Sequence, residues 1–217
     1  MKLKHISHLI TGSVMELFGV MADGKVVNSY ELTNKRGAKM KVINYGATVT
    51  SLKIPLKSGE MVDVVLGFDT LENYINSFDL ESAPYLGATV GRYAGRINNA
   101  TFNLNGEIIH LDKNNNGHSL HGGKDNFSKK VWEVKNVNEG CSPSITFGYL
   151  SPANEGNYPG DLSVELTYTL SENNELIIEY NAQTTEDTVL NLTHHSYFKL
   201  DGHDSSVSEQ ELIVNSH

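Results

Sequence analysis

Cysteine, basic charge and long hydrophobic runs are scarce in this sequence. Cys141 is the only cysteine among 217 residues, which excludes a disulfide within the chain and argues against a cysteine-based zinc site. The formal net charge of −9 argues against a nucleic-acid partner, because binding to a phosphate backbone requires clustered lysine and arginine.

Targeting and membrane segments are not evident either. No apolar stretch approaches the length of a membrane span, so no membrane partner is expected. Residues 1–10 carry charge but lack the continuous apolar core of a signal peptide. We therefore expect a soluble cytoplasmic protein. The content of 39% hydrophobic and 20% charged residues is typical of a globular chain, and residues 1–217 are expected to form a single domain.

The dominant pattern is the alternation of apolar and polar residues, which is typical of half-buried β-strands. It predicts one strand at residues 162–170 and a second at residues 176–180. The turn-forming residues 171–174 separate them, so we expect the two strands to form a hairpin.

A second hairpin is predicted at residues 101–111. Its centre is Asn105-Gly106, which suits a two-residue turn with positive φ at both positions. In that register Phe102 faces Ile109, and the apolar residues of the hairpin share one face.

The rest of the chain is also rich in short strand candidates. Further strands are predicted at residues 41–54, 63–67, 144–149 and 189–198. Residues 71–74 form the one predicted helix, and Asp69-Thr70 before it is the candidate cap. Residues 211–217 look like a strand that has just begun, so we expect the sequence to be a truncation. Many short strands joined by glycine and asparagine turns indicate an all-β sandwich or barrel.

Two adjacent histidines, His194 and His195, lie in the last predicted strand. Neighbouring residues of a strand point to opposite faces, so the two rings are not expected to serve one site. Imidazole is the side chain best suited to exchange protons near neutral pH. The alternative is a histidine that only satisfies a hydrogen bond in the core.

Three loops carry further candidate residues. Residues 91–96 contain Arg92 and Arg96, which are either solvated arginines near a turn or donors aimed at sugar hydroxyls. Residues 116–123 contain His118 and His121, whose flanking glycines permit a tight turn or a close approach to a ligand. Residues 154–160 either shape the rim of a pocket or form a structural turn, and the turn is the favoured interpretation.

Six segments of the chain resemble the galactose mutarotase (aldose 1-epimerase) family, in the order in which the family has them. They are Asn44-Tyr45-Gly46-Ala47, Asp63-Val64-Val65-Leu66-Gly67-Phe68, Gly91-Arg92-Tyr93-Ala94-Gly95-Arg96-Ile97, Ser119-Leu120-His121-Gly122-Gly123, Glu155-Gly156-Asn157-Tyr158-Pro159-Gly160 and Asn191-Leu192-Thr193-His194-His195-Ser196-Tyr197-Phe198. One such segment alone would carry little weight, but six in order extend over nearly the whole chain.

The resemblance implies a large antiparallel β-sandwich, the family's supersandwich fold, with an open face that binds sugar. It implies interconversion of the α and β anomers of free aldohexoses such as galactose and glucose. The partner is then a small-molecule aldose, and neither a cofactor nor a metal is expected. The sequence leaves open whether the protein is a monomer or a homodimer.

The resemblance also assigns roles to individual residues. His195 matches the acid that protonates the ring oxygen, His121 and Arg96 match residues that contact the sugar, and Tyr197 matches a residue of the same pocket. Gly95 stands where the family commonly has an asparagine that helps to bind sugar.

Two functional residues of the family have no match in this sequence. The family's catalytic base is a glutamate near the C-terminus, and an aspartate that binds sugar also comes late in the family's sequences. Neither corresponds to a residue among the 217. We therefore expect the 217-residue chain alone to have little or no epimerase activity.

Two other classes of function remain. A non-catalytic carbohydrate-binding module on the same scaffold would keep Arg96 and His121 and need no base. A metal-dependent, cupin-like enzyme would use His118, His121 and His195, although no third ligand of known spacing stands out in the sequence.

Overall fold

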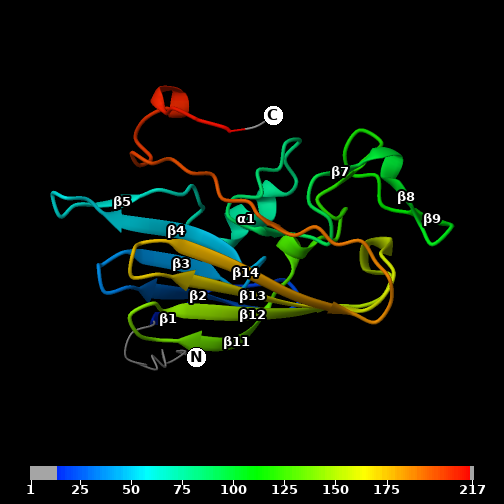
Figure 1. The fold of residues 1–217 in the computed structure, drawn as a ribbon, viewed down its shortest axis with the longest axis horizontal. Helices are drawn as coiled ribbons and strands as arrows, with labels where there is room; N and C mark the ends of the chain where they lie inside the picture. The colour runs from blue at the N-terminus through cyan, green and yellow to red at the C-terminus, as the bar shows by residue number, and fades with distance from the viewer. Residues whose placement is uncertain (1–13, 216–217) are drawn as a thin grey trace.

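The computed structural model describes residues 14–215, and its two main sheets are antiparallel (Figure 1). The first sheet has five strands in chain order, each paired with the next. They are β1 (Val14–Val20), β2 (Val26–Thr33), β3 (Lys39–Ile43), β4 (Thr48–Pro55) and β5 (Met61–Asp63). As expected for a residue that cannot donate to the ladder, Pro55 ends its strand.

The second sheet has four strands, also in chain order. They are β11 (Glu133–Asn138), β12 (Ser144–Ser151), β13 (Leu162–Leu170) and β14 (Leu176–Thr184). β13 alternates between buried and more exposed residues along its whole length, as its sequence predicts. The predicted β13–β14 hairpin is confirmed, with Leu170 opposite Leu176, and β14 continues beyond the predicted end at residue 180.

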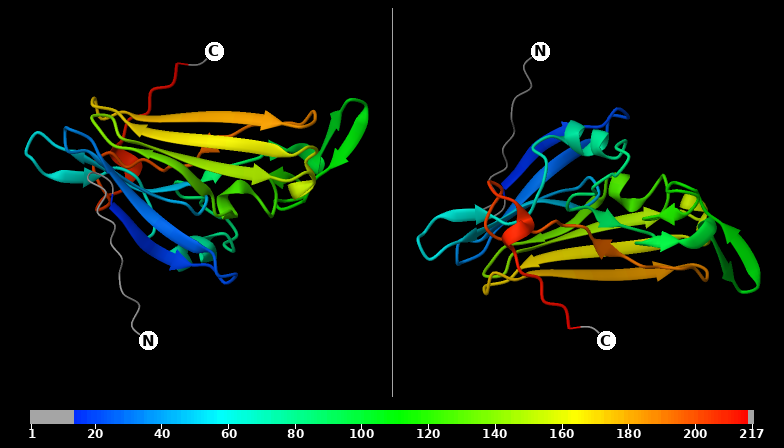
Figure 2. Two further views of the ribbon diagram at one scale, coloured as in Figure 1. Left: turned by 90° about the horizontal axis from the view of Figure 1, so that it is seen from below. Right: turned by 90° about the horizontal axis from the view of Figure 1, so that it is seen from above.

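The two sheets form the layers of a sandwich, and one hydrophobic core lies between them (Figure 2). Leu32, Met40 and Val42 of the first sheet are fully buried in the same cluster as Phe147 and Leu166 of the second. Burial of apolar surface contributes roughly 25 cal/mol per Å², so this shared core is the main stabilising contact between the sheets. The predicted all-β sandwich is therefore confirmed.

Shorter elements lie outside the two sheets. They are α1 (Leu71–Ser77), β6 (Thr89–Val90), β7 (Arg96–Ile97), η1 (Asn98–Ala100), β8 (Thr101–Leu104), β9 (Glu107–His110), β10 (Ser119–Leu120), η2 (Phe127–Lys129), η3 (Glu155–Asn157), β15 (Thr193–His194) and η4 (Val207–Glu209). The predicted helix is confirmed, and the Thr70 side chain caps it by accepting a hydrogen bond from the Asn73 N–H. The β8–β9 hairpin is confirmed too, with Phe102 opposite Ile109.

Three predicted strands are broken in the structure. Residues 41–54 form parts of β3 and β4, because the chain turns at Gly46 and Ala47, which both have positive φ. In the predicted strand 63–67, only Asp63 belongs to β5, which ends there. The Val64 N–H then donates to the Leu52 carbonyl and the Leu66 N–H to the Tyr197 carbonyl, so the segment forms no continuous ladder with one partner strand. Of residues 189–198, only Thr193 and His194 form a strand.

The prediction of a strand at residues 211–217 is wrong for the part that the structure describes. Residues 211–215 have no regular structure, and Leu212 and Ile213 are 86% and 77% exposed. Residues 216–217 and the N-terminal segment 1–10 lie outside the described residues. Among residues 14–215, no helix is both long and apolar enough to cross a membrane.

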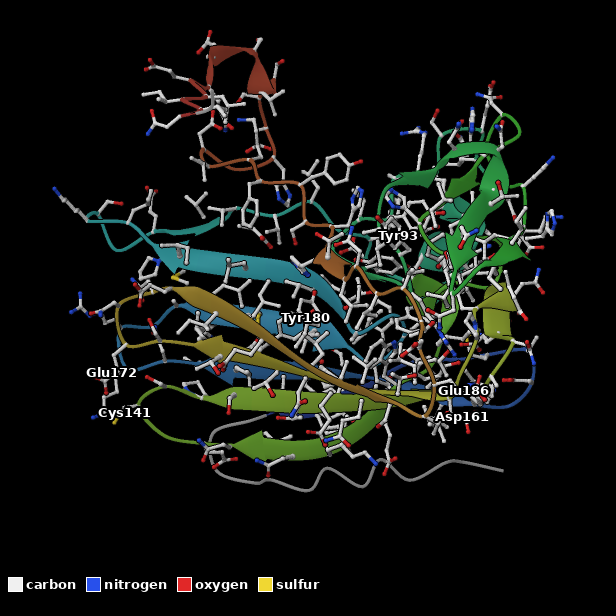
Figure 3. All side chains as sticks on the ribbon, turned by 45° about the vertical axis from the view of Figure 1, so that its right-hand side comes forward. Tyr93, Cys141, Asp161, Glu172, Tyr180 and Glu186 are labelled. Carbon is white, nitrogen blue, oxygen red and sulfur yellow. The ribbon has the colours of Figure 1, made fainter. Side chains whose placement is uncertain are left out.

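Cys141 is a free thiol at one end of the second sheet. Figure 3 shows it close to Glu172, at the opposite end of the sheet from Asp161 and Glu186. Cys141 does not line the cavity that contains His121 and His195, which is described below.

Candidate active site

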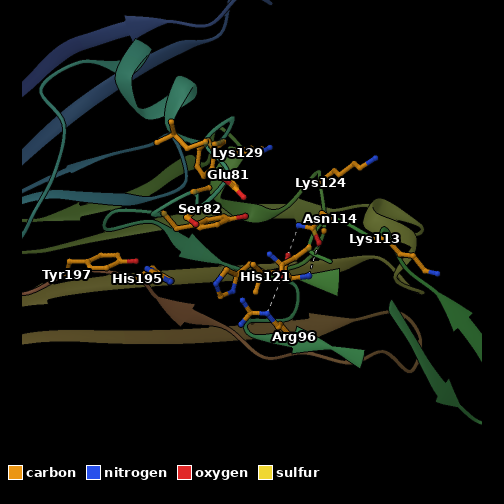
Figure 4. Close-up of a pocket in the computed structure, with 17 residues that line it drawn as sticks. Glu81, Ser82, Arg96, Lys113, Asn114, His121, Lys124, Lys129, His195 and Tyr197 are labelled. Atoms are coloured by element: carbon orange, nitrogen blue, oxygen red, sulfur yellow. Dashed lines mark hydrogen bonds between the residues drawn. The ribbon is translucent and has the colours of Figure 1, made fainter. Parts of the chain in front are cut away.

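A cavity of about 530 Å³ lies among the short elements (Figure 4). Its size is within the range of roughly 300–1,000 Å³ that ligand pockets have. Side chains from four separate parts of the chain line it. They are the segment after α1 with Phe78, Leu80, Glu81, Ser82, Ala83 and Tyr85, the strand residue Arg96, the segment 113–129 with Lys113, Asn114, Asn115, Leu120, His121, Gly123, Lys124 and Lys129, and the residues His195 and Tyr197 after β15.

His195 is held by two backbone hydrogen bonds to the 87–88 segment. Its N–H donates to the Ala88 carbonyl at 2.9 Å, and its own carbonyl accepts from the Gly87 N–H at 3.1 Å. The ring centroid lies 5.3 Å from that of His121, 5.3 Å from that of Tyr197 and 5.9 Å from that of Tyr85. The side chain therefore lines an open cavity while its backbone is fixed.

His194 contacts a different group of residues, as strand alternation predicts. Its Nδ1 lies 3.3 Å from the Tyr168 hydroxyl in the core, and its Nε2 lies 2.6 Å from the Ser196 hydroxyl. Burial, aided by the charge of His195, lowers the pKa of His194 to about 4. His194 is thus the histidine that satisfies a core hydrogen bond, and His195 is the one available to a ligand.

His121 is oriented by Gly95. The Gly95 N–H donates to His121 Nδ1 at 3.1 Å, and the His121 N–H donates back to the Gly95 carbonyl at 3.0 Å. Nδ1 is therefore the acceptor of the neutral ring, which leaves the proton on Nε2. Burial, followed by the charges of His195 and Arg96, lowers the pKa of His121 to about 4. At neutral pH this ring offers an N–H donor to the cavity.

Arg96 and Tyr197 complete the set that the sequence singles out. Arg96 pairs with Leu120 between β7 and β10, which brings it next to His121. Its Nε donates to Asn115 Oδ1 at 3.1 Å, and the side chain is exposed. Tyr197 is 42% exposed beside His195. The structure thus brings these four residues to one cavity.

Comparison with known proteins decides the family. A family model described as Aldose 1-epimerase matches residues 28–217. The chain belongs to the aldose 1-epimerase family. Galactose mutarotase from Homo sapiens is 38% identical over 202 residues, which are 92% of this chain and 56% of the human protein. Aldose 1-epimerase from Haemophilus influenzae is 36% identical over 200 residues, which are 89% of this chain and 54% of that protein.

Solved structures of aldose 1-epimerase homologues have the same fold. An aldose epimerase homologue from C. elegans gives a TM-score of 0.72 at 36% identity, covering 81% of this chain and 51% of that one. Galactose 1-epimerase from Lactobacillus acidophilus gives 0.75 at 26% identity, covering 87% and 53%. The chain spans about half the length of the relatives that it matches.

The resemblance predicts that Gly95 replaces an asparagine that is common in the family. Its φ is +84°, a conformation that asparagine tolerates better than most residues, and a Cβ added there meets nothing within 4 Å. Gly95 also lines a second cavity of about 510 Å³, which shares His121 and His195 with the first. A side chain at position 95 would therefore have room to reach the site.

The structure separates the two arginines of the 91–96 segment. Arg92 is buried, and it donates to the Ser151 hydroxyl and carbonyl and to the carbonyls of Pro152 and Pro159, each at 2.9 Å. Its proposed role as a donor to sugar hydroxyls is therefore wrong, because every bond that it makes is internal. Residues 154–160 are likewise part of the scaffold, in agreement with the favoured interpretation.

The His118–His121 pair does not form part of a metal site. The His118 Nδ1 accepts a hydrogen bond from the Asn99 N–H at 3.0 Å. Within the part of the chain that the structure describes, no group of three or more His, Cys, Asp or Glu side chains is placed to hold a metal ion. The cupin-like alternative, which needs His118, His121 and His195 together, therefore has no geometric support.

Several residues of this cavity are not identifiable from the sequence. Tyr85 is 7% exposed, and its ring meets the His121 ring edge-on with centroids 4.9 Å apart. Lys113, Lys124 and Lys129 also line the cavity. Tyr85 follows Pro84 in a segment without periodicity, so no sequence pattern indicates that its ring is buried at the cavity. Lysines are common on protein surfaces, so the sequence does not distinguish the three cavity lysines from other lysines.

Proposed function

We propose that this chain provides the acid and the sugar-binding part of an aldose 1-epimerase site that interconverts the α and β anomers of free aldohexoses such as galactose and glucose. The observation that carries the proposal is the convergence of His195, His121, Arg96 and Tyr197 on one open cavity from separate segments. Relatives at 33–40% identity named galactose mutarotase or aldose 1-epimerase support the same reaction.

In the proposed reaction His195 donates a proton to the ring oxygen as the bond between that oxygen and C1 breaks. A base removes the proton of the C1 hydroxyl, and C1 becomes an aldehyde. Rotation about the C1–C2 bond followed by closure gives the other anomer. We assign no residue of this chain as the base, because the resemblance places that role on a glutamate without a counterpart in the sequence.

The neighbouring groups suit the binding of an uncharged sugar ring next to that acid. His121 offers an Nε2–H donor, Arg96 offers its guanidinium N–H groups, and the Tyr197 ring provides an apolar surface beside His195. The cytoplasmic location, the single domain over residues 1–217 and the choice between monomer and homodimer remain predictions from the sequence.

The test is polarimetry on freshly dissolved α-D-galactose with the full-length protein, because the 217-residue chain alone is expected to have little or no activity, together with galactose binding followed by NMR. His195→Ala should lower the enzyme-catalysed rate by about 10²–10⁴-fold and leave binding largely intact. The matched control is His110→Ala, an exposed histidine of β9 that does not line the cavity. A wild-type rate in the His195→Ala variant would show that the acid is assigned wrongly.

The same experiment separates the epimerase from the carbohydrate-binding module. In the full-length protein, binding of galactose that depends on Arg96 and His121, without any acceleration of mutarotation, would favour the module. Binding and catalysis lost together in the His121→Ala variant, with catalysis alone lost in His195→Ala, would favour the enzyme.

A further inference from the structure

Glu155 of η3 is a buried carboxylate that does not line the cavity. Its side chain is only 10% exposed, and three side chains bond to it. The Tyr149 hydroxyl donates to Oε1 at 2.6 Å, and Lys130 Nζ lies 2.7 Å from the same oxygen. The Ser151 hydroxyl donates to Oε2. Burial of a carboxylate is costly unless charges and hydrogen bonds compensate it, and here both oxygens have partners.

Ser151 connects this carboxylate to Arg92. The Ser151 hydroxyl accepts from Arg92 Nε at 2.9 Å while it donates to Glu155. The other hydrogen bonds of the Arg92 guanidinium go to backbone carbonyls, which carry no net charge. Burial lowers the pKa of Arg92, and the charge of Glu155 is the largest influence in the opposite direction. Glu155 is therefore the counter-charge of the buried Arg92, separated from it by one hydroxyl group.

Arg92 in turn anchors the segment that orients His121. The hydrogen bonds that join residues 91–96 to β12 come from the Arg92 side chain, since the backbone of the segment bonds to loops and short elements. One of these backbone bonds runs from the Asn191 N–H to the Arg92 carbonyl at 2.9 Å. Three residues further along the chain, the Gly95 N–H donates to His121 Nδ1. The position of this amide, and with it the tautomer of the His121 ring, therefore depends on how firmly Arg92 is held.

We propose that Glu155 is a positioning residue of the epimerase site, which acts through Ser151 and Arg92 on the backbone amide that orients His121. The inference rests on the proposed function, since it takes His121 to contact the sugar. Loss of the carboxylate would leave Arg92 buried without its counter-charge. A buried charge without its partner is strongly destabilising, so the segment that carries it would move toward water.

The first measurement is NMR of the two ring nitrogens of His121 in the full-length protein at neutral pH. In the wild type, Nδ1 should give the signal of an acceptor and Nε2 that of a protonated nitrogen, because Nδ1 accepts from the Gly95 N–H. Glu155→Gln removes the charge and keeps the size of the side chain. In that variant both nitrogen shifts should move toward the average of the two tautomers. A purely structural role would lower stability without moving these shifts.

The second measurement is the kinetics of galactose mutarotation in the same full-length protein. In Glu155→Gln, kcat/KM should fall by about 10–10²-fold, the usual effect of a small displacement in a site. Most of the fall should be in KM, because His121 contacts the sugar, whereas His195 is held independently by the 87–88 segment. Ser151→Ala removes only the link to Arg92 and keeps the ion pair of Glu155 with Lys130. It should change the same quantities in the same direction, and it decides the question if Glu155→Gln does not fold.

The matched control is Asp125→Asn. Asp125 is the second partner of Lys130, also at 2.7 Å, but its side chain is 65% exposed. Among residues 14–215, no hydrogen bond joins it to Ser151 or Arg92. This variant should therefore keep the wild-type nitrogen shifts of His121 and the wild-type KM.

Two results would overturn the inference and leave the proposed function standing. One is a folded Glu155→Gln variant with wild-type nitrogen shifts and KM. The other is an equal change in Asp125→Asn, because the effect would then act through Lys130 and not through Arg92. If the wild-type full-length protein neither binds galactose nor accelerates mutarotation, the proposed function fails. The nitrogen shifts of His121 then decide alone whether Glu155 positions that ring.

Discussion

The two histidines with depressed pKa values connect the site to the stability of the fold. Burial, aided by the charge of His195, lowers the pKa values of the half-buried His121 and the more deeply buried His194 from the ordinary 6.5 to about 4. The unfolded chain therefore binds more protons than the folded chain between these two pH values. It follows that the free energy of unfolding falls as the pH is lowered from about 6.5 toward about 4.

This effect can be measured by urea unfolding at pH 7 and pH 5. Each of the two histidines should contribute a loss of roughly 1–2 kcal/mol at the lower pH, since one pKa unit corresponds to about 1.4 kcal/mol. His121→Gln should reduce the pH dependence, whereas the exposed-site variant His110→Gln should retain it. An equal pH dependence in all three proteins would contradict the assignment.

We predict that the Tyr85 ring lowers the pKa of His121 by shielding the His121 ring from water. It is buried at the cavity wall, with its ring edge-on to His121 and tilted relative to His195. Because burial is the main cause of the low pKa of His121, Tyr85→Ala should raise that pKa back toward 6.5 by admitting water. NMR titration of the His121 ring measures this directly. Tyr85→Phe keeps the ring, so it should leave the pKa near 4.

At the scale of elements, the turns on the two sides of β10 depend on glycine for different reasons. Gly122 has a φ of +86°, and a Cβ added there would lie 2.0 Å from the Gly91 carbonyl oxygen. Gly117 has a similar φ of +83°, but a Cβ added there meets nothing within 4 Å. The first position therefore requires glycine for close approach as well as for its backbone conformation.

This pair of glycines allows a controlled prediction. Gly117→Ala should cost about 1–2 kcal/mol, the ordinary penalty for a left-handed residue. Gly122→Ala should cost more and should also weaken galactose binding, because the clash moves the loop that holds His121. Thermal unfolding and NMR binding provide the two measurements. Equal destabilisation by the two substitutions would show that close packing at Gly122 is unimportant.

Most of the predicted elements have a local signal, although β2, whose residues 30–33 alternate between buried and partly exposed, was not predicted. The β8–β9 turn was predictable because Asn105 and Gly106 favour the positive φ that both adopt. β11 was missed because a bulge near Val134 spaces its inward valines three residues apart, which hides the period of two. β1 was missed because it is an edge strand with an almost wholly exposed pattern.

The same distinction applies to the site. His195, His121, Arg96 and Tyr197 were found because the segments around them resemble those of a known family. The lysines of the cavity lie in loops that become neighbours only through pairings such as that of Arg96 with Leu120. Contacts between segments that are distant in sequence depend on the whole fold, so they cannot be predicted from the pattern within one segment.

At the scale of the whole molecule, the site depends on packing that lies far from it. The segment that carries His195 is hydrogen-bonded to the 87–88 segment, and His194 beside it contacts Tyr168 of β13. Tyr168 is fully buried in the core between the two sheets. Loosening of that core should therefore disturb the position of His195, the proposed acid, through its neighbour in sequence, His194.

A substitution in β13 tests whether the two sheets unfold as one unit. Leu166 is fully buried between the sheets, so Leu166→Ala should lower the free energy of unfolding by about 2–5 kcal/mol. Glu165→Ala is the matched control, because Glu165 directly precedes Leu166 in the strand and faces solvent. It should change the stability by less than about 0.5 kcal/mol.

Two probes report on different parts of the molecule during urea unfolding. Fluorescence of Trp132, the single tryptophan, follows the shared core, and far-UV circular dichroism follows all strands. Because one cluster of buried side chains joins both sheets, the two curves should coincide in the wild type and shift together in Leu166→Ala. Separate transitions for the two probes would mean that each sheet is stable alone, and that the common core does not couple them.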